Sequence, residues 1–145
     1  MRIYRVLFVL LVIFISENVL AQNTNVAVPD ISKFSEISEF CETKTCIEAM
    51  GNVWLRDSAP SRFFYINGEK IEPVSKNEIL VVLKKEEVKT LFNSYEWLNV
   101  RRLSFDSEGN KIETKKETGW VYNGNLDGQN YFELVNPQKF IENKE

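Results

Sequence analysis

Three carboxylates near one predicted turn are the residues best placed for acid–base chemistry in this sequence. Asp106, Glu108 and Glu113 lie close together along the chain, and a pair of carboxyl groups can act as proton donor and proton acceptor. Residues 106–111 are typical of a hairpin tip, however, where water keeps carboxylates ionised. The same segment lacks the alternating oxygen ligands of an EF-hand calcium loop. We therefore expect a solvated turn.

The residue types that are missing narrow the chemistry further. The 145 residues include no histidine, which excludes Ser-His-Asp and Cys-His nucleophiles and imidazole metal ligands. Two cysteines are too few for a thiolate zinc or iron–sulfur site. A net charge of -3 argues against a nucleic-acid surface, which needs an excess of lysine and arginine. We predict one small domain that is not an enzyme and has no cofactor, no metal ion and no nucleic-acid partner.

The two cysteines are predicted to form a local disulfide. Cys41 and Cys46 lie in Cys-Glu-Thr-Lys-Thr-Cys, which is not the Cys-x-x-Cys spacing of a redox centre. In one continuous helix their Cα atoms would lie about 8 Å apart, beyond the roughly 7 Å that a disulfide tolerates. The bridge and an unbroken helix therefore exclude each other, and the turn-forming Glu-Thr-Lys-Thr favours the bridge.

Residues 1–21 have the pattern of a secretory signal peptide. Two arginines precede the apolar run 6–15, and cleavage is expected after Ala21, which ends a stretch of small residues. The alternative is a membrane anchor, but a spanning helix needs about 20 apolar residues. We predict an exported protein, periplasmic or secreted, that does not span the membrane after cleavage and in which a disulfide persists.

The rest of the chain divides into three parts. Residues 22–50 are predicted to be a leader with a short amphipathic helix and the cysteine pair, residues 51–135 a β domain, and residues 136–145 a polar tail. The apolar stripe of the helix is Ile31, Phe34, Ile37 and Phe40. We expect this helix to cover one end of the core and the side chain of Trp54; docking to a partner is the alternative.

Short apolar segments separated by turn residues predict a small barrel or sandwich. Phe63–Ile71 contains Asn-Gly between apolar residues and predicts a hairpin. Ile79–Leu83 is apolar throughout and is expected to be buried on both faces. Lys84–Tyr95 is charged with apolar residues at helical spacing, which predicts a helical turn between strands.

Four segments in this order resemble the bacterial SH3-like (SH3b) domain family. Residues 51–61 hold a short strand that ends in arginine and is followed by a loop with proline and serine. Lys76–Leu83 is similar to the turn and second strand of the family, and Glu96–Arg101 to the next strand with its tryptophan. Gly119–Val121 matches the closing Gly-Trp-Val. The likeness covers about residues 51–126.

The resemblance implies a mainly β fold, a small and strongly bent SH3-like β-barrel preceded by a short N-terminal helical segment. It also implies binding of peptides or cell-wall polymers without catalysis. Three segments are longer than usual in the family, namely Phe63–Ile71, Lys84–Tyr95 and Ser104–Lys116. Asn123-Gly124-Asn125 stands where the family has an aromatic residue after Gly-Trp-Val, which departs from an ordinary SH3 peptide groove.

Aromatic side chains are the predicted ligand-binding residues. In the resemblance Trp97 corresponds to a groove tryptophan, whose indole offers a stacking face and an N–H donor to a proline-rich peptide or a sugar ring. Tyr65, Tyr95 and Tyr122 are predicted to line the same site, with Tyr131 as a further candidate for its rim. A purely structural place in or beside the core is the alternative for each.

Two function classes stay open. The first is a monomeric, exported binding module of the bacterial cell envelope that recognises a cell-wall component or a peptide. The alternative is a protein–protein inhibitor or immunity-type partner that uses the long loops to block an envelope enzyme.

Overall fold

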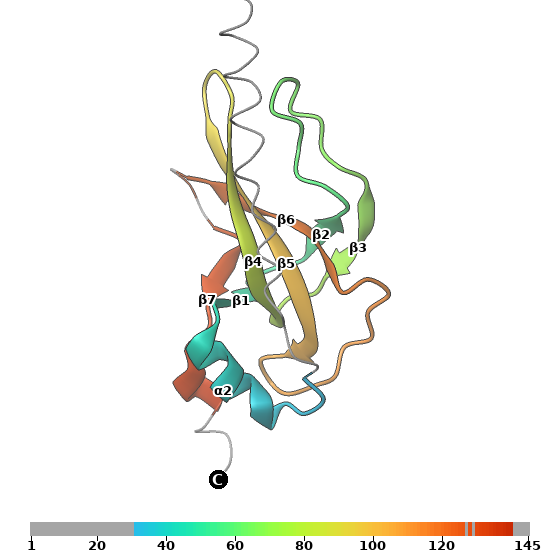
Figure 1. The fold of residues 1–145 in the computed structure, drawn as a ribbon, viewed down its shortest axis with the longest axis vertical. Coiled ribbons are helices and arrows are strands. Elements are labelled where there is room, and N and C mark those ends of the chain that lie inside the picture. Colours follow the sequence, from blue (N-terminus) through green and yellow to red (C-terminus); the bar gives the residue numbers. More distant parts are fainter. Residues whose placement is uncertain (1–30, 127, 129, 141–145) are drawn as a thin grey trace, which may run out of the picture.

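The computed structural model describes residues 31–126, 128 and 130–140 (Figure 1). They form a mainly β fold, as predicted, with elements in the order α2 (Ser35–Thr43), β1 (Cys46–Ala49), β2 (Val53–Arg56), β3 (Lys70–Val74), β4 (Glu78–Lys89), β5 (Ser94–Asp106), β6 (Thr118–Asn125), β7 (Phe132–Leu134) and the 3-10 helix η1 (Pro137–Phe140). The predicted signal peptide, the first part of the predicted leader and the last residues of the predicted tail lie outside the described residues.

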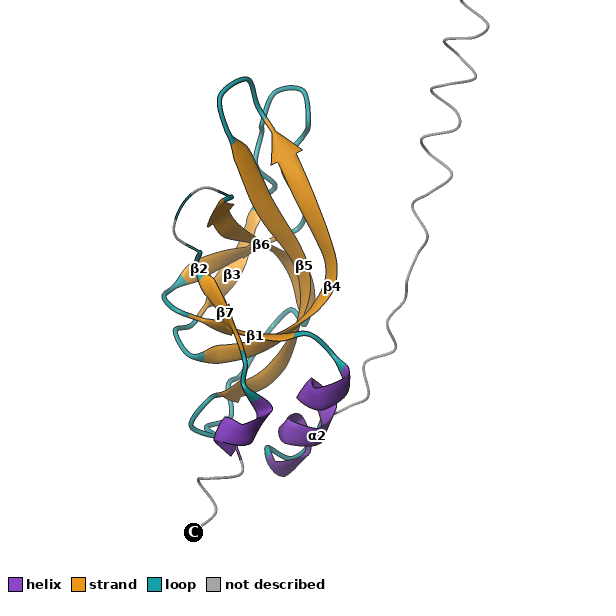
Figure 2. Cartoon of the chain, turned by 90° about the vertical axis from the view of Figure 1, so that its left-hand side faces the viewer, coloured by secondary structure: helices purple, strands orange, loops and turns teal. Residues whose placement is uncertain are grey.

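The seven strands form one antiparallel sheet in the order β3-β2-β6-β5-β4-β1-β7. Its longest pairing is the β4–β5 hairpin, which extends from Glu78 opposite Asp106 to Lys89 opposite Ser94. The sheet is strongly curled (Figure 2), and its two edge strands, β3 and β7, lie on opposite sides of the molecule in Figure 1. No backbone pairing joins these edges in the described part of the chain, so the sheet is not closed into a barrel.

The concave face of the sheet encloses an apolar core to which every strand contributes. Its buried members are Ile47, Ala49, Val53, Leu55, Val74, Leu80, Leu98, Val100, Val121 and Phe132. On β2 the period of two directs Val53 and Leu55 inward and Trp54 outward. A Cβ atom on Gly119 would lie 2.7 Å from the Arg56 carbonyl oxygen, so β6 can approach β2 this closely only with glycine there.

A second apolar cluster lies on the other face of β4, under the helices. Ile79 and Val81 belong to this cluster, whereas Leu80 between them belongs to the first. The run Ile79–Leu83 therefore packs on both faces, as its unbroken apolar sequence predicts. The predicted helix stripe supplies Ile37 and Phe40, and η1 adds Phe140.

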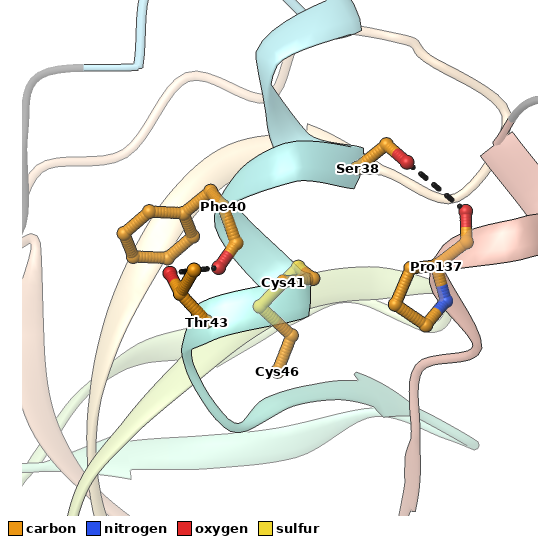
Figure 3. Close-up of a disulfide and its surroundings, with 6 residues drawn as sticks. All are labelled: Ser38, Phe40, Cys41, Thr43, Cys46 and Pro137. Carbon is orange, nitrogen blue, oxygen red and sulfur yellow. Dashed lines mark hydrogen bonds between the residues drawn. A yellow bond between two sulfur atoms is a disulfide. The ribbon is translucent and has the colours of Figure 1, made fainter.

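The predicted disulfide joins the end of α2 to β1 (Figure 3). The Cα atoms of Cys41 and Cys46 are 5.4 Å apart. Helix α2 ends at Thr43, whose Oγ1 donates a hydrogen bond to the Phe40 carbonyl at 3.0 Å. The chain then turns into extended conformation at Lys44, so the two cysteines do not share one helix, as the spacing argument requires.

Two local predictions are wrong, and the sheet begins earlier than expected. Phe63–Ile66 is not a hairpin arm but part of the loop between β2 and β3, and Lys84–Tyr95 has no helical turn because β4 and β5 run through it. In both segments the apolar side chains at the end of the loop are exposed. Their spacing along the chain therefore does not indicate which side of the segment faces the core. Strand β1 adds Cys46–Ala49 to the sheet, before residue 51.

A buried arginine connects strands that are not neighbours in the sheet. Arg102 on β5 is 4% exposed, and its Nη2 donates to Glu78 Oε2 at 2.9 Å while its Nε donates to Oε1 of the same carboxylate. Its Nη1 lies 2.7 Å from Glu72 Oε1 on β3. Because β2 and β6 stand between β3 and β5 in the sheet order, this contact reaches across the curl of the sheet.

Removal of the disulfide is expected to lower the free energy of unfolding by about 2 kcal/mol, because the bridge restricts a short loop of the unfolded chain. The measurement is urea unfolding of a Cys41→Ala/Cys46→Ala variant. Reduction of the unmodified chain is the matched control, because it keeps both sulfur atoms. An unfolding midpoint that is unchanged on reduction would contradict the expectation.

Acid is expected to loosen the contact between Glu72 and Arg102. Burial opposes ionisation of Glu72, but backbone N–H donors of Lys116 and Lys115 and the charge of Arg102 together lower its pKa below 4.5. The unfolded chain therefore takes up this proton first, and the stabilisation is lost as pH falls from about 4.5 through the folded pKa. In urea unfolding at a series of pH values, Glu72→Gln should show a shallower acid decline than the unmodified chain; parallel declines would refute this.

Candidate functional site: an aromatic cleft

The four predicted binding aromatics meet around one cleft of about 400 Å³. Strands β2, β5 and β6 supply most of its wall, the loop before β3 supplies two residues, and the segment before β7 supplies one. The lining residues are Val53, Trp54, Arg56, Tyr65, Asn67, Tyr95, Trp97, Tyr122 and Tyr131.

The tyrosine rings form a continuous band along the cleft. The ring centroids of Tyr65 and Tyr95 are 4.8 Å apart, those of Tyr95 and Tyr122 are 6.1 Å apart, and those of Tyr122 and Tyr131 are 5.6 Å apart. Each pair is tilted, which is a favourable arrangement for aromatic quadrupoles at such distances. The band therefore presents flat apolar faces together with phenolic hydroxyl groups.

Trp97 lies beneath this band and not at its surface. The side chain is 2% exposed, and its ring centroid lies 5.4 Å from that of Tyr122. Its Nε1–H donates to the Tyr65 hydroxyl at 3.3 Å, so the indole donor already has a partner. Trp97 thus forms the floor of the cleft and positions the tyrosines above it.

Tyr65 reaches the cleft through an unusual backbone conformation. Its φ is +49°, a left-handed value that is uncommon for a bulky residue. The conformation is held by its backbone N–H, which donates to the Ser61 carbonyl at 2.9 Å. Strain of this kind persists only where surrounding contacts require it; here these are the Tyr95 ring and the Trp97 indole.

The polar character of the cleft comes from neutral phenols and one cation. Burial raises the pKa of Tyr65 above 10.0, although the hydrogen bond from Trp97 acts in the opposite direction. Burial likewise raises the pKa of Tyr122, so both phenols are neutral at pH 7 and can donate hydrogen bonds. Arg56 adds a permanent positive charge, and its Nη1 donates to the Gly68 carbonyl at 2.7 Å.

The contribution of β2 to the cleft was not predicted from the sequence. Trp54 is 43% exposed, so the prediction that the N-terminal helix covers it is wrong; Lys70 Nζ lies 4.8 Å from the centre of its ring instead. Trp54 and Arg56 are two positions apart on one strand and therefore share a face. That spacing was a usable signal for both residues, whereas nothing in the sequence pattern marks Asn67.

The carboxylates considered for acid–base chemistry lie in a turn away from the cleft. Asp106 Oδ1 accepts hydrogen bonds from the backbone N–H groups of Glu108 at 3.0 Å and Asn110 at 2.8 Å. Burial works against ionisation of Asp106, but these donors and the Asn110 side chain lower its pKa below 3.8. The carboxylate therefore stabilises the turn in its ionised form.

A larger cavity of about 600 Å³ lies between β1, β5 and the residues near β7. Its buried carboxylate, Glu96, accepts a hydrogen bond from Asn123 Nδ2 at 2.7 Å and forms an ion pair with Lys85. Asn123 Oδ1 in turn accepts the backbone N–H of Phe132. These polar groups satisfy one another and hold β7 on the sheet, so the smaller aromatic cleft is the better candidate for a ligand.

Comparisons with models of known protein families, with curated proteins and with solved structures find no match for this chain. The SH3-like resemblance therefore stays a prediction, as does the binding role of Trp97, Tyr65, Tyr95 and Tyr122. No helix within the described part of the chain combines the length and the hydropathy of a membrane span.

Trp97→Ala is expected to lower the free energy of unfolding by about 3–5 kcal/mol, because it removes a large buried side chain from the floor of the cleft. Tyr131→Ala is the matched comparison: Tyr131 is 45% exposed and its removal should cost less than about 1 kcal/mol. Urea unfolding followed by far-ultraviolet circular dichroism measures both. Equal losses would show that Trp97 is not the floor described here.

Proposed function

We propose that this protein is an exported, non-enzymatic binding module of SH3-like type that holds a cell-wall component in the aromatic cleft. The observation that carries the proposal is the band of four tyrosines over Trp97, with Arg56 beside it. A binding site built from rigid aromatic rings loses little conformational entropy when a ligand arrives.

The chemistry of the cleft suits a wall polymer made of sugars and short peptides. Ring faces such as those of Tyr95 and Tyr122 can stack on a sugar ring or a proline, and their hydroxyl groups can bond to ligand oxygens. The guanidinium of Arg56 attracts a carboxylate with directed donors. A peptide that bears carboxylates and is attached to sugar rings can bind both to the tyrosine ring faces and to the Arg56 guanidinium.

The lining of the cleft supports binding without catalysis. Its ionisable side chains among the described residues are Arg56 and tyrosines. The raised pKa values of Tyr65 and Tyr122 leave these phenols protonated, and an arginine stays charged at all working pH values. A general base that acts near pH 7 needs a pKa close to 7, far below the pKa of these two phenols.

Three features support the SH3-like type and export. The strongly curled antiparallel sheet and the close passage of Gly119 against Arg56 support the strong bend that the family implies, in a sheet that is not closed into a barrel. The disulfide between Cys41 and Cys46 agrees with an oxidising compartment.

The test is co-sedimentation with purified peptidoglycan. Because Trp97 is buried, the informative variants are those of exposed or half-exposed tyrosines: Tyr131→Ala and Tyr95→Ala should each weaken binding about tenfold, which corresponds to the loss of one aromatic contact of about 1.4 kcal/mol. Leu134→Ala is the matched control, because Leu134 is 75% exposed on β7 and lies outside the cleft.

Two further measurements separate the alternatives. Soluble wall fragments, one with glycan only and one with peptide only, identify the part of the polymer that the cleft binds. If unmodified protein ignores both fragments and the polymer, and instead recovers one envelope protein in equal stoichiometry, the wall-binding proposal is wrong and the inhibitor or immunity-type alternative replaces it.

A further inference from the structure

Five large apolar side chains project from two loops into solvent. Phe63, Phe64 and Ile66, in the loop between β2 and β3, are 89%, 82% and 65% exposed, and Leu91 and Phe92, in the turn between β4 and β5, are 94% and 90% exposed. We call these residues the apolar tips. Exposure of this degree in a group of large apolar side chains marks an interaction surface.

The two loops lie next to each other at one end of the molecule. Both views place them together at the end opposite α2 and η1 (Figures 1 and 2). Two contacts join the loops: the Tyr65 and Tyr95 rings, 4.8 Å apart, and an ion pair between Arg62 Nη2 and Glu86 Oε1 at 3.5 Å. The apolar tips therefore lie at the same end of the molecule, on two loops that the Tyr65–Tyr95 and Arg62–Glu86 contacts hold near each other.

Local hydrogen bonds hold both tips in shape. Thr90 and Asn93 close the β4–β5 turn, with the Thr90 N–H donating to the Asn93 carbonyl at 2.8 Å, so Leu91 and Phe92 occupy the middle of the turn. That place favours glycine, asparagine or aspartate. Leu91 and Phe92 therefore stabilise neither the turn nor the core, and we expect them to contact a partner outside the chain.

The charge pattern favours an anionic lipid surface. Residues 61–66 carry Arg62 and residues 89–94 carry Lys89, and neither segment has a carboxylate, although the whole chain has a net charge of -3. Both side chains are largely exposed, at 77% and 72%. The carboxylates that pair with them, Glu86 and Glu87, lie further from the tip on β4.

The depth of the tips matches the boundary of a bilayer. Tyr95 is the second residue of β5, three residues beyond Phe92 in the turn, and tyrosine is enriched at the level of lipid head groups. Side chains that enter a membrane surface reach about 5–10 Å below it. Protruding convex tips also suit a deformable surface better than the matched concave pocket that a rigid protein must supply.

We propose that the apolar tips insert into the head-group region of a bilayer that contains anionic lipid, and hold the protein at a membrane surface with the aromatic cleft beside it. The inference does not depend on the wall-binding function, because none of the five apolar tip residues lines the cleft.

The test uses the full chain with a single added cysteine at Phe92→Cys, labelled with an environment-sensitive fluorophore. The two native cysteines are in a disulfide and do not take the label. On addition of phosphatidylglycerol–phosphatidylethanolamine vesicles, the label at residue 92 should show the blue shift of an apolar environment. The matched position Glu39→Cys on α2, at the other end, should not respond. A response at residue 39 alone, or at neither position, would overturn the proposal.

Partitioning onto the same vesicles supplies a second measurement. Phe64→Ser/Leu91→Ser should reduce the tip-dependent signal by about tenfold or more, whereas the exposed control Leu134→Ser and the cleft variant Tyr131→Ala should leave it unchanged. The signal should also be weaker with phosphatidylcholine vesicles; equal signals would overturn the role of Arg62 and Lys89. If the tip variant instead abolishes self-association and leaves vesicle binding intact, the partner is a second copy of the chain and the lipid proposal is wrong.

Discussion

The contact of Arg102 with Glu72 and Glu78 is the constraint that joins β5 to β3 across the curl of the sheet. A charge buried to this extent is tolerated only when it is paired and hydrogen-bonded, because its desolvation is expensive. The sequence satisfies this by placing Glu78 at the start of β4 and Glu72 on β3. Backbone pairing does not join β3 to β5, so the ion pair of Arg102 with Glu72 connects two strands that are not neighbours in the sheet.

The aromatic cleft follows from the same curl. Strands β5 and β6 pair directly, with Trp97 opposite Tyr122, but Tyr65 arrives from a loop that is anchored by β2 and β3. A flat sheet would leave that loop distant from β5. The ion pair holds Glu72 of β3 against β5, and Tyr65, in the loop before β3, accepts the Trp97 donor and extends the tyrosine band. The electrostatic contact at Arg102 and the ring contacts at Tyr95 and Trp97 thus lie toward opposite ends of β5.

Much of this arrangement could be predicted from the sequence, because the residues concerned pack in the core or must satisfy the fixed geometry of a disulfide. Ile79–Leu83 is apolar at every position and packs on two faces. The spacing of Cys41 and Cys46 makes a disulfide and an unbroken helix exclude each other, and the turn-forming residues between them favoured the bridge that the structure contains. That the sheet curls without closing into the predicted barrel could not be predicted in the same way. It depends on which edges meet in space, and the long-range pair between Glu72 and Arg102 leaves no periodic trace in the sequence.

The predictions that failed lie at Phe63–Ile66 and Lys84–Tyr95, and they failed for one physical reason. Hydrophobic periodicity predicts structure only if apolar residues are selected for burial within the chain. Phe63 and Leu91 are almost fully exposed, so an interpretation based on burial assigned them to a strand and a helical turn that do not exist. Conflict between local pattern and fold is expected where residues serve something other than folding. The failure of both predictions at Phe63–Ile66 and Lys84–Tyr95 is therefore a further argument, separate from charge and depth, that the apolar tips contact a partner outside the chain.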